Sequence, residues 1–169
     1  MTLEMSRKYL VPFMTTFLLL GMAGAWGPGE CASSKAPPFS LSTPEGETVR
    51  LEDFSGKVVY LDFWSSQCYP CLLQIPQLVS LYNAHREKGL VVIGISLGDS
   101  EDTLRHYIQK MGITYPVVAG DDQIVELYRG IYFLPTAFLI DREGLLRKKF
   151  FGYRDREAIE HLILPLLEE

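Results

Sequence analysis

Two largely apolar stretches of the chain are separated by a segment with helical spacing. Residues 57–64 (Lys-Val-Val-Tyr-Leu-Asp-Phe-Trp) and residues 90–97 are rich in β-branched and aromatic side chains without strict alternation. This composition is typical of strands that are buried on both faces. Between them the apolar residues recur at helical spacing and predict one helix face: Leu72, Ile75, Val79 and Tyr82.

The alternation of strands and helices continues to the end of the chain. Polar and acidic residues at 100–102 open a second helix, and Pro44 and Gly46 predict the turn of a small β-hairpin upstream. The remaining pattern predicts a strand at 116–119, a helix at 121–128, strands at 136–140 and 145–151 joined by a tight turn, and a helix from Asp155. This order predicts an α/β fold, with a mixed sheet flanked by helices.

The amino-terminal segment has the pattern of an export signal. Arg7 and Lys8 precede the apolar residues 9–26, and small residues at 23–25 end the stretch. We predict a secretory signal peptide cleaved after Ala25, with an uncleaved signal anchor in the inner membrane as the alternative. Because the basic residues come before the apolar stretch, either version places the rest of the chain outside the cytoplasm, in the periplasm or an equivalent compartment.

The sequence therefore predicts three parts along the chain. Residues 1–25 are the signal peptide or anchor, residues 26–38 a flexible leader rich in Gly, Pro and Ser, and residues 39–169 a single folded domain. Cys31 lies in the leader, and its role stays open. The net charge of −5 argues against nucleic-acid binding, which needs a basic face. We expect a monomer.

Cys68 and Cys71 carry the strongest chemical signal in the sequence. They follow the first buried strand and open a helix, so their sulfurs face one another across a single turn, and Pro70 fits the first turn. The unpaired amides at the helix start stabilise a thiolate, which is the reactive form of cysteine. The pattern predicts a redox-active pair, with a structural disulfide as the alternative. Zinc would need further ligands, and haem attachment would need a histidine in place of Leu72.

Two separate motifs of the chain resemble one protein family. The first is Phe63-Trp64-Ser65-Ser66-Gln67-Cys68-Tyr69-Pro70-Cys71, followed by Pro76. The second is Leu134-Pro135-Thr136-Ala137-Phe138-Leu139-Ile140-Asp141, followed by Gly144. Together they resemble the thioredoxin superfamily, and more narrowly its exported TlpA/ResA-like branch of thiol–disulfide oxidoreductases. The resemblance covers residues 38–167 and implies a thioredoxin-like fold with the β-hairpin as an amino-terminal extension.

The resemblance also implies roles for residues near the cysteines. The proline that matches Pro135 is cis in this family, lies beside the sulfurs, offers backbone hydrogen bonds to the substrate and keeps metals away. We therefore expect a cis bond at Pro135, although most bonds before proline are trans. No cofactor or metal is expected. The expected substrate contacts are Trp64, Tyr69, Pro70, Leu134 and Thr136.

Two positions depart from the pattern of this branch. Gln74 stands where the branch often carries glutamate, and Asp62 stands where it usually carries asparagine, although thioredoxin itself has aspartate there. A buried carboxyl beside a thiol can take and return its proton, which glutamine cannot do. Asp62 is therefore a catalytic candidate, and a strand residue without catalytic weight is the alternative. The three histidines are expected on helix surfaces: His85, His106 and His161.

These observations predict a thiol–disulfide oxidoreductase of the cell envelope. Cys68 attacks a substrate disulfide and Cys71 resolves the mixed disulfide. By resemblance, the substrates are exported proteins with transient disulfides, such as an apocytochrome c or a copper-site assembly protein, and a membrane thiol electron donor restores the dithiol. A disulfide-donating oxidase fits the same residues, and a copper-binding metallochaperone-like module would need a further His or Met near the pair. The residue pattern of a peroxidatic cysteine is absent before Cys68.

Overall fold

The structure, a computed structural model, describes residues 34–169, so the predicted signal or anchor and Cys31 lie outside the described residues. Within this range no helix has the length and apolar character that crossing a membrane requires. The helices and strands follow the predicted order: β1 (Ser40–Ser42), β2 (Thr48–Arg50), 3-10 helix η1 (Leu51–Phe54), β3 (Val58–Trp64), α1 (Tyr69–His85), 3-10 helix η2 (Arg86–Lys88), β4 (Leu90–Leu97), α2 (Glu101–Met111), β5 (Val117–Gly120), α3 (Asp122–Leu127), β6 (Thr136–Ile140), β7 (Leu146–Phe151) and α4 (Arg156–Glu168).

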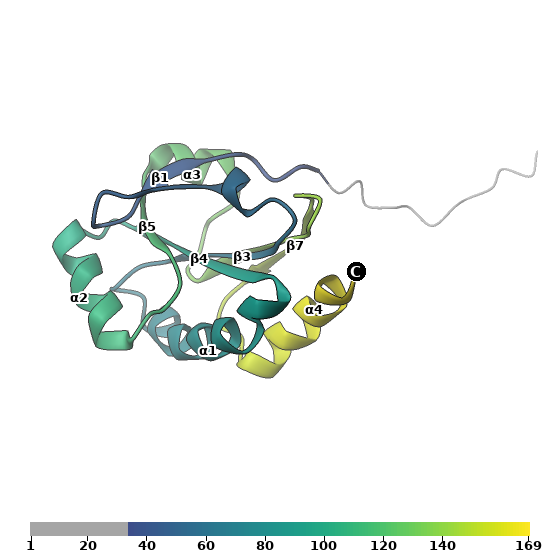
Figure 1. Cartoon of the computed structure of the whole chain (residues 1–169). Helices are drawn as coiled ribbons and strands as arrows, with labels where there is room; N and C mark the ends of the chain where they lie inside the picture. The colour runs from purple at the N-terminus through teal and green to yellow at the C-terminus, as the bar shows by residue number, and fades with distance from the viewer. Residues whose placement is uncertain (1–33) are drawn as a thin grey trace, which may run out of the picture. The chain divides into compact units, whose positions relative to one another are not determined.

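Five strands form the central sheet in the order β5-β4-β3-β6-β7. β3 pairs with β4, and β4 with β5, in parallel, whereas β3 pairs with β6, and β6 with β7, in antiparallel fashion. All seven residues of the central strand β3 are buried. Figure 1 shows α1 and α4 on one side of the sheet and α3 with the β1–β2 hairpin on the other. The predicted mixed sheet flanked by helices, with a separate amino-terminal hairpin, is confirmed.

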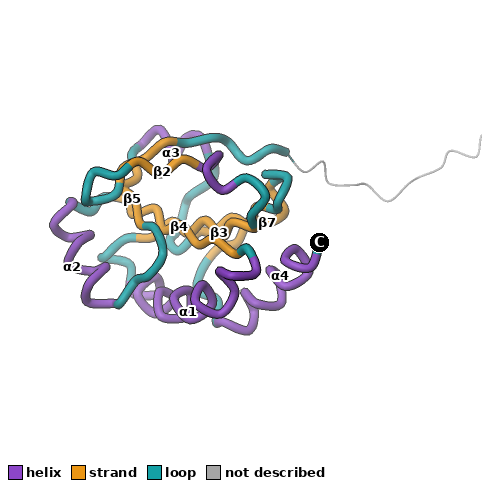
Figure 2. Tube along the Cα trace, viewed as in Figure 1, coloured by secondary structure: helices purple, strands orange, loops and turns teal. Residues whose placement is uncertain are grey.

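The two faces of β3 belong to two different parts of the core. Successive side chains of a strand point to opposite faces. Val58, Tyr60 and Trp64 pack with α1 and α4. Val59, Leu61 and Phe63 pack toward α3 and the hairpin. Figure 2 shows the orange strands between these two helical layers. Asp62 lies on the same face of β3 as Tyr60 and Trp64, because alternate residues of a strand share a face, and this face is covered by α1.

The buried face of α1 differs in part from the predicted stripe. Ile75 is buried as expected, but Leu78 and Leu81 complete the apolar face, whereas Leu72, Val79 and Tyr82 are only half-buried. Helix α1 packs against both the sheet and α4, so its buried face is wider and rotated. Two polar residues on that face, Gln74 and His85, obscured it in the sequence.

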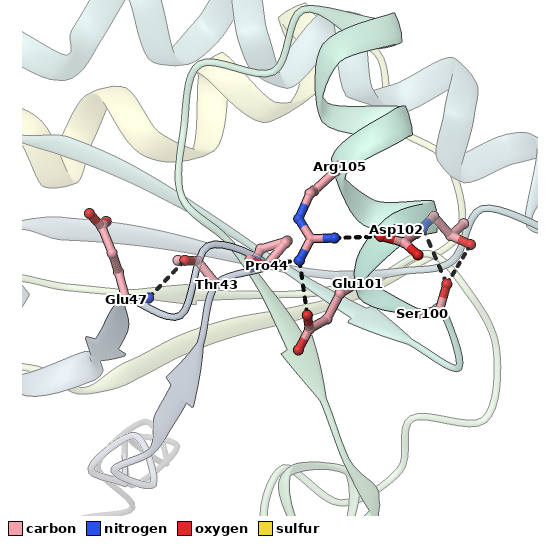
Figure 3. A network of polar contacts seen from close by, with 8 residues as sticks. Thr43, Pro44, Glu47, Ser100, Glu101, Asp102 and Arg105 are labelled. Carbon is pink, nitrogen blue, oxygen red and sulfur yellow. Dashed lines mark hydrogen bonds and ion pairs between the residues drawn. The ribbon is translucent and has the colours of Figure 1, made fainter.

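A polar network fastens the hairpin to α2 (Figure 3). Thr43 and Pro44 lie in the turn of the hairpin, where Thr43 O accepts a hydrogen bond from the Gly46 amide. Arg105 on α2 donates through Nη2 to Pro44 O at 2.8 Å and also binds Asp102 and Glu101 at the start of its own helix. The carboxylates hold the guanidinium in place, so the extension is attached to the domain by directional bonds.

The last residues of the predicted leader are part of the fold. The Leu146 amide donates to Ser34 O at 2.8 Å, and the Ala36 amide donates to Gly144 O at 2.9 Å. Ala36 is buried against the face of the sheet that carries the hairpin. Residues 34–38 are therefore attached to the β6–β7 turn, whereas the sequence placed them in a flexible segment.

Candidate active site

Cys68 and Cys71 form a disulfide at the start of α1, with an S–S distance of 2.02 Å. Cys68 occupies the N-cap position, and its sulfur accepts a hydrogen bond from the Cys71 amide at 3.3 Å. A sulfur in this position receives the partial positive charge of the helix start. Cys71 is completely buried, whereas Cys68 is half-buried. Of the two sulfurs, Cys68 is therefore the one that a partner protein can approach.

Asp62 lies on β3, on the face that α1 covers, and is completely buried. Its neighbours across the sheet are two small residues, Gly94 on β4 and Ala137 on β6. A methyl group at Gly94 would lie 3.1 Å from Trp64 Nε1, a tight contact that favours glycine there. Burial raises the pKa of Asp62 to about 7, and a hydrogen bond from Gln74 acts in the opposite direction.

Gln74 connects Asp62 to another part of the domain. Its Nε2 donates to Asp62 Oδ1 at 3.1 Å, and its Oε1 accepts the backbone amide of Arg154 at 2.9 Å. Among residues 34–169, Asp62 Oδ2 has no hydrogen-bond partner. Gln74 follows Cys71 by three residues on α1, so both side chains lie on the same helix face. The buried acid is thus on the side of the helix that carries the resolving sulfur.

The Leu134–Pro135 peptide bond is cis, as predicted. Pro135 O accepts a hydrogen bond from the Gly152 amide at 2.8 Å, in the same β7–α4 loop whose Arg154 amide binds Gln74. Leu134 and Cys68 both pack at the edge of the apolar core that α1 covers. One loop therefore contacts both the proline segment and the residue that binds the buried acid.

The expected substrate contacts fall into two groups. Tyr69 is 71% exposed, Pro70 is exposed and Leu134 is half-buried, so these three can meet a partner. Trp64 and Thr136 were also predicted as contacts, and both side chains are completely buried in this structure. Trp64 packs in the same core cluster as Cys71 and against the Tyr107 ring, and Thr136 Oγ1 donates to Phe133 O. Both side chains pack inside the domain.

His85 was expected on the surface and is instead buried between α1 and α4. Its Nε2 lies 2.5 Å from Glu160 Oε1, which also accepts a bond from Arg156. His106 and His161 are exposed, as predicted. His85 ends the helix that Cys68 caps, about 25 Å away at the rise of an α-helix. Among the described residues 34–169, no group of three or more His, Cys, Asp and Glu side chains could hold a metal ion.

The sequence and the fold were compared with those of known proteins. The model of the AhpC/TSA family matches residues 32–149, which is well over half of the chain. The chain belongs to the AhpC/TSA family. The relatives of this AhpC/TSA-family protein indicate which chemistry the Cys68–Cys71 pair performs.

A thiol–disulfide oxidoreductase ResA from Geobacillus thermodenitrificans is 36% identical over 131 residues, which cover 76% of this chain and 75% of that protein. A crystal structure of a thiol:disulfide interchange protein DsbE, described as putative, from Chlorobium tepidum is 35% identical, covers 80% of this chain and 96% of the other, and has a TM-score of 0.75. A thioredoxin family protein from Chlorobium tepidum TLS, at 24% identity, covers 82% and 99% of the two chains with a TM-score of 0.77 and shares the fold.

These relatives confirm the predicted family and activity. The AhpC/TSA-family protein described here has a thioredoxin-like fold and is a thiol–disulfide oxidoreductase whose redox pair is Cys68 and Cys71. The pair lies at the start of α1, and three residues separate it from the end of the central strand, as the sequence indicated.

Sequence reasoning missed two groups of polar contacts around the pair. The first is the bond between Gln74 and the Arg154 amide, which joins positions 80 residues apart and leaves no local signal. The second is Asp99, which binds Ser66 just before the redox pair. That contact had a signal, because parallel strands β3 and β4 end at the same edge of the sheet and a polar residue follows each of them.

Proposed function

We propose that this oxidoreductase reduces disulfide bonds of exported proteins outside the cytoplasm. The observation that carries the proposal is the unequal burial of the two sulfurs, with Cys68 half-buried at the helix start and Cys71 fully buried behind it. A pair arranged in this way has one sulfur for attack and one for resolution.

The reaction proceeds in two exchanges. The Cys68 thiolate attacks one sulfur of the substrate disulfide, a mixed disulfide forms, and the other substrate sulfur leaves and takes up a proton. The Cys71 thiolate then attacks Cys68 Sγ, the protein disulfide forms, and the second substrate sulfur leaves as a thiol. The substrate gains two electrons and two protons, and the dithiol of the protein is oxidised.

Asp62 is the proposed proton acceptor for Cys71. A buried thiol needs a base before it can attack, and an acid whose pKa lies near the working pH exchanges protons in both directions. The pKa of Asp62, raised to about 7 by burial, meets this condition. Its unpartnered oxygen and its place on the Cys71 side of α1 support the role.

The proposed docking site for the substrate is formed by the exposed residues near the pair. Tyr69 and Pro70 directly follow Cys68, and Leu134 and Pro135 belong to the segment that leads into β6. The cis-Pro135 segment is proposed to offer backbone hydrogen bonds to the substrate chain through Leu134, because Pro135 has no N–H and its carbonyl already accepts the Gly152 amide. Exposed aromatic side chains at Tyr132 and Phe133 extend this surface.

The cellular setting is part of the proposal. Residues 9–26 are proposed to export the domain as a cleaved signal peptide or to hold it at the inner membrane, a membrane thiol protein returns the electrons, and the domain acts as a monomer. The names of the relatives, a thiol–disulfide oxidoreductase and a thiol:disulfide interchange protein, support the disulfide exchange. The proposed role like that in cytochrome c maturation rests on the resemblance to the TlpA/ResA-like branch. A periplasmic reporter fused after Glu169 should be active, and deletion of residues 1–25 should abolish this activity; a reporter active only in the cytoplasm would contradict export.

The reduction potential of the Cys68–Cys71 pair sets whether the protein reduces or oxidises its substrates. A reductase needs a potential below that of its substrates, because electrons flow toward the couple with the higher potential. For a two-electron couple, about 30 mV corresponds to a tenfold change in the equilibrium constant. Equilibration with glutathione buffers should give a potential close to that of thioredoxin, about −270 mV. A value near −120 mV, together with efficient oxidation of reduced substrates, would instead indicate a disulfide-donating oxidase. Two assays test the copper-binding alternative. The reduced protein is titrated with Cu(I), and its ability to reduce insulin is then measured.

A further inference from the structure

Asp99 accepts three hydrogen bonds from two serines at the edge of the sheet. Its Oδ2 receives the Ser66 amide at 2.8 Å and the Ser96 hydroxyl at 2.5 Å, and its Oδ1 receives the Ser66 hydroxyl at 2.5 Å. Ser96 is buried, and Asp99 and Ser66 are half-buried. Hydroxyl bonds of this length to a carboxylate are of the strong, charge-assisted type.

The topology explains why these residues meet. Trp64, the last residue of β3, pairs in parallel with Ser96 of β4, so both strands end at the same edge. The chain turns after β4 at Gly98, whose φ of 79° suits glycine, and this turn brings Asp99 back toward the end of β3. Asp99 thereby joins the loop that leads into the redox pair to the neighbouring strand.

That loop has few other restraints. Ser65, Ser66 and Gln67 separate β3 from Cys68, whose amide donates to Ser65 O at 3.1 Å. In the oxidised protein the disulfide also holds Cys68 to α1. After reduction the disulfide restraint is lost. The Cys68 carbonyl still accepts the Leu72 amide at 3.1 Å, which keeps its backbone at the helix start. The loop before Cys68 then restrains the direction in which its sulfur points, toward the unpaired amides that stabilise the thiolate.

We propose that Asp99 is a positioning residue that holds the Ser65–Gln67 loop, and with it Cys68 Sγ, at the amino-terminal end of α1 when the pair is reduced. The three bonds act on the reduced form more than on the oxidised form, because only the reduced form lacks the disulfide. This inference rests on the proposed role of Cys68 as the attacking sulfur.

Two substitutions separate the bonds of Asp99 from its charge. Asparagine can accept the Ser66 amide and the Ser96 hydroxyl with its oxygen and donate to the Ser66 hydroxyl with its nitrogen, so Asp99→Asn keeps the geometry and removes the charge. Asp99→Ala removes both. Asp102→Ala is the matched control, because it removes an exposed carboxylate three residues away that binds Arg105 and not the loop.

The test measures the rate at which iodoacetamide alkylates Cys68 in the reduced full-length protein at pH 7, with the site assigned by mass spectrometry. Asp99→Ala should lower this rate about threefold, in line with the usual effect of a helix start on a charge. Asp99→Asn and Asp102→Ala should leave it unchanged. Ser66→Ala, which loses one of the three bonds and keeps the backbone bond, should give a smaller decrease and serves if Asp99→Ala does not fold.

The redox equilibrium with glutathione provides a readout that a general loss of stability does not move. Asp99→Ala should shift it about threefold toward the disulfide form, because the reduced form loses the interaction. Unchanged alkylation and equilibrium in Asp99→Ala would overturn the inference, as would an equal decrease in Asp99→Asn. If Cys71 is the faster thiol in the unchanged protein, the proposed function fails; if Cys68 is faster but insensitive to Asp99→Ala, only this inference fails.

Discussion

Gln74 holds its amide group between the carboxyl of Asp62 and a backbone amide, with Nε2 at 3.1 Å from Asp62 Oδ1 and Oε1 at 2.9 Å from the Arg154 nitrogen. A flipped amide would place its oxygen against the carboxyl and its NH2 against the Arg154 N–H, so the backbone amide determines the orientation. The resulting bond favours the ionised form of Asp62, while burial favours the protonated form. The balance of the two keeps the pKa of the acid near neutrality.

Replacing Asp62 with asparagine should slow the second exchange and leave the first intact. The introduced amide could still accept the Gln74 bond but could not take the proton of Cys71, and general bases typically contribute about 10²-fold or more. In single-turnover reduction of a model disulfide at pH 7, formation of the mixed disulfide should keep its rate and its resolution should slow by about that factor. Equal rates in Asp62→Asn and the parent would leave Asp62 as a structural residue.

The same substitution should change how stability depends on pH. Because burial raises the folded-state pKa of Asp62 to about 7 from an ordinary value of 3.8, the unfolded chain releases the proton first. The parent should therefore lose stability as the pH rises from about 4 to about 7, by a few kcal/mol. Asp62→Asn should lack this loss and be the more stable protein at pH 8. Urea unfolding of both oxidised proteins at pH 4.5, 6 and 8 tests the sign; parallel pH profiles would contradict it.

Gln74→Glu should introduce a second proton acceptor beside Asp62. The new carboxyl can still accept the Arg154 amide, and two carboxyls in contact share one proton, so the pKa of one rises further. In the Asp62→Asn background, Gln74→Glu should restore part of the resolution rate. Gln77→Glu is the control, because residue 77 lies on the same helix and is only half-buried. Rescue by Gln77→Glu to the same extent would show that proximity to Asp62 is irrelevant.

His85 and Glu160 should stabilise the packing of α1 on α4 in a pH-dependent way. The bond to His85 is the main cause that lowers the pKa of Glu160 below its ordinary 4.5. A lowered folded-state pKa contributes stability above the ordinary pKa, and this contribution is lost as the pH falls through the lowered value. Glu160→Gln should therefore be less stable than the parent at pH 6, and the difference should shrink below pH 4. Denaturant unfolding at both pH values measures the difference, and a constant difference would argue against a stabilising contact of ionised Glu160.

The order of the elements and the redox pair followed from the sequence because they depend on local patterns. Strand β4 and strand β6 have the predicted limits, and the cysteines lie at the predicted strand–helix junction. The cis bond at Pro135 came from the family resemblance, since a bare sequence favours trans. Trp64 shows the limit of this approach: its place in a motif marked it as near the pair, but only the packed core shows that it is fully covered.

Contacts between distant segments were the part that the sequence did not reveal. Histidine is a polar residue type, so the sequence places His85 on the surface. Its burial depends on a partner 75 residues further on, Glu160. The predicted stripe of α1 was displaced because a polar residue on the buried face, Gln74, is satisfied by Asp62 and a backbone amide. Helical periodicity counts polar residues as exposed, so it misses a face where buried polar groups bind one another.

The central claim is that Cys68 attacks and Cys71 resolves, and substrate trapping tests it most directly. Cys71→Ser should accumulate a mixed disulfide with a peptide or protein disulfide substrate, visible by mass spectrometry as a link at Cys68, because the resolving thiol is absent. Cys68→Ser should form no such link and should abolish disulfide reduction. A Cys71→Ser protein that turns over as fast as the parent, or a Cys68→Ser protein that is linked through Cys71, would contradict the account.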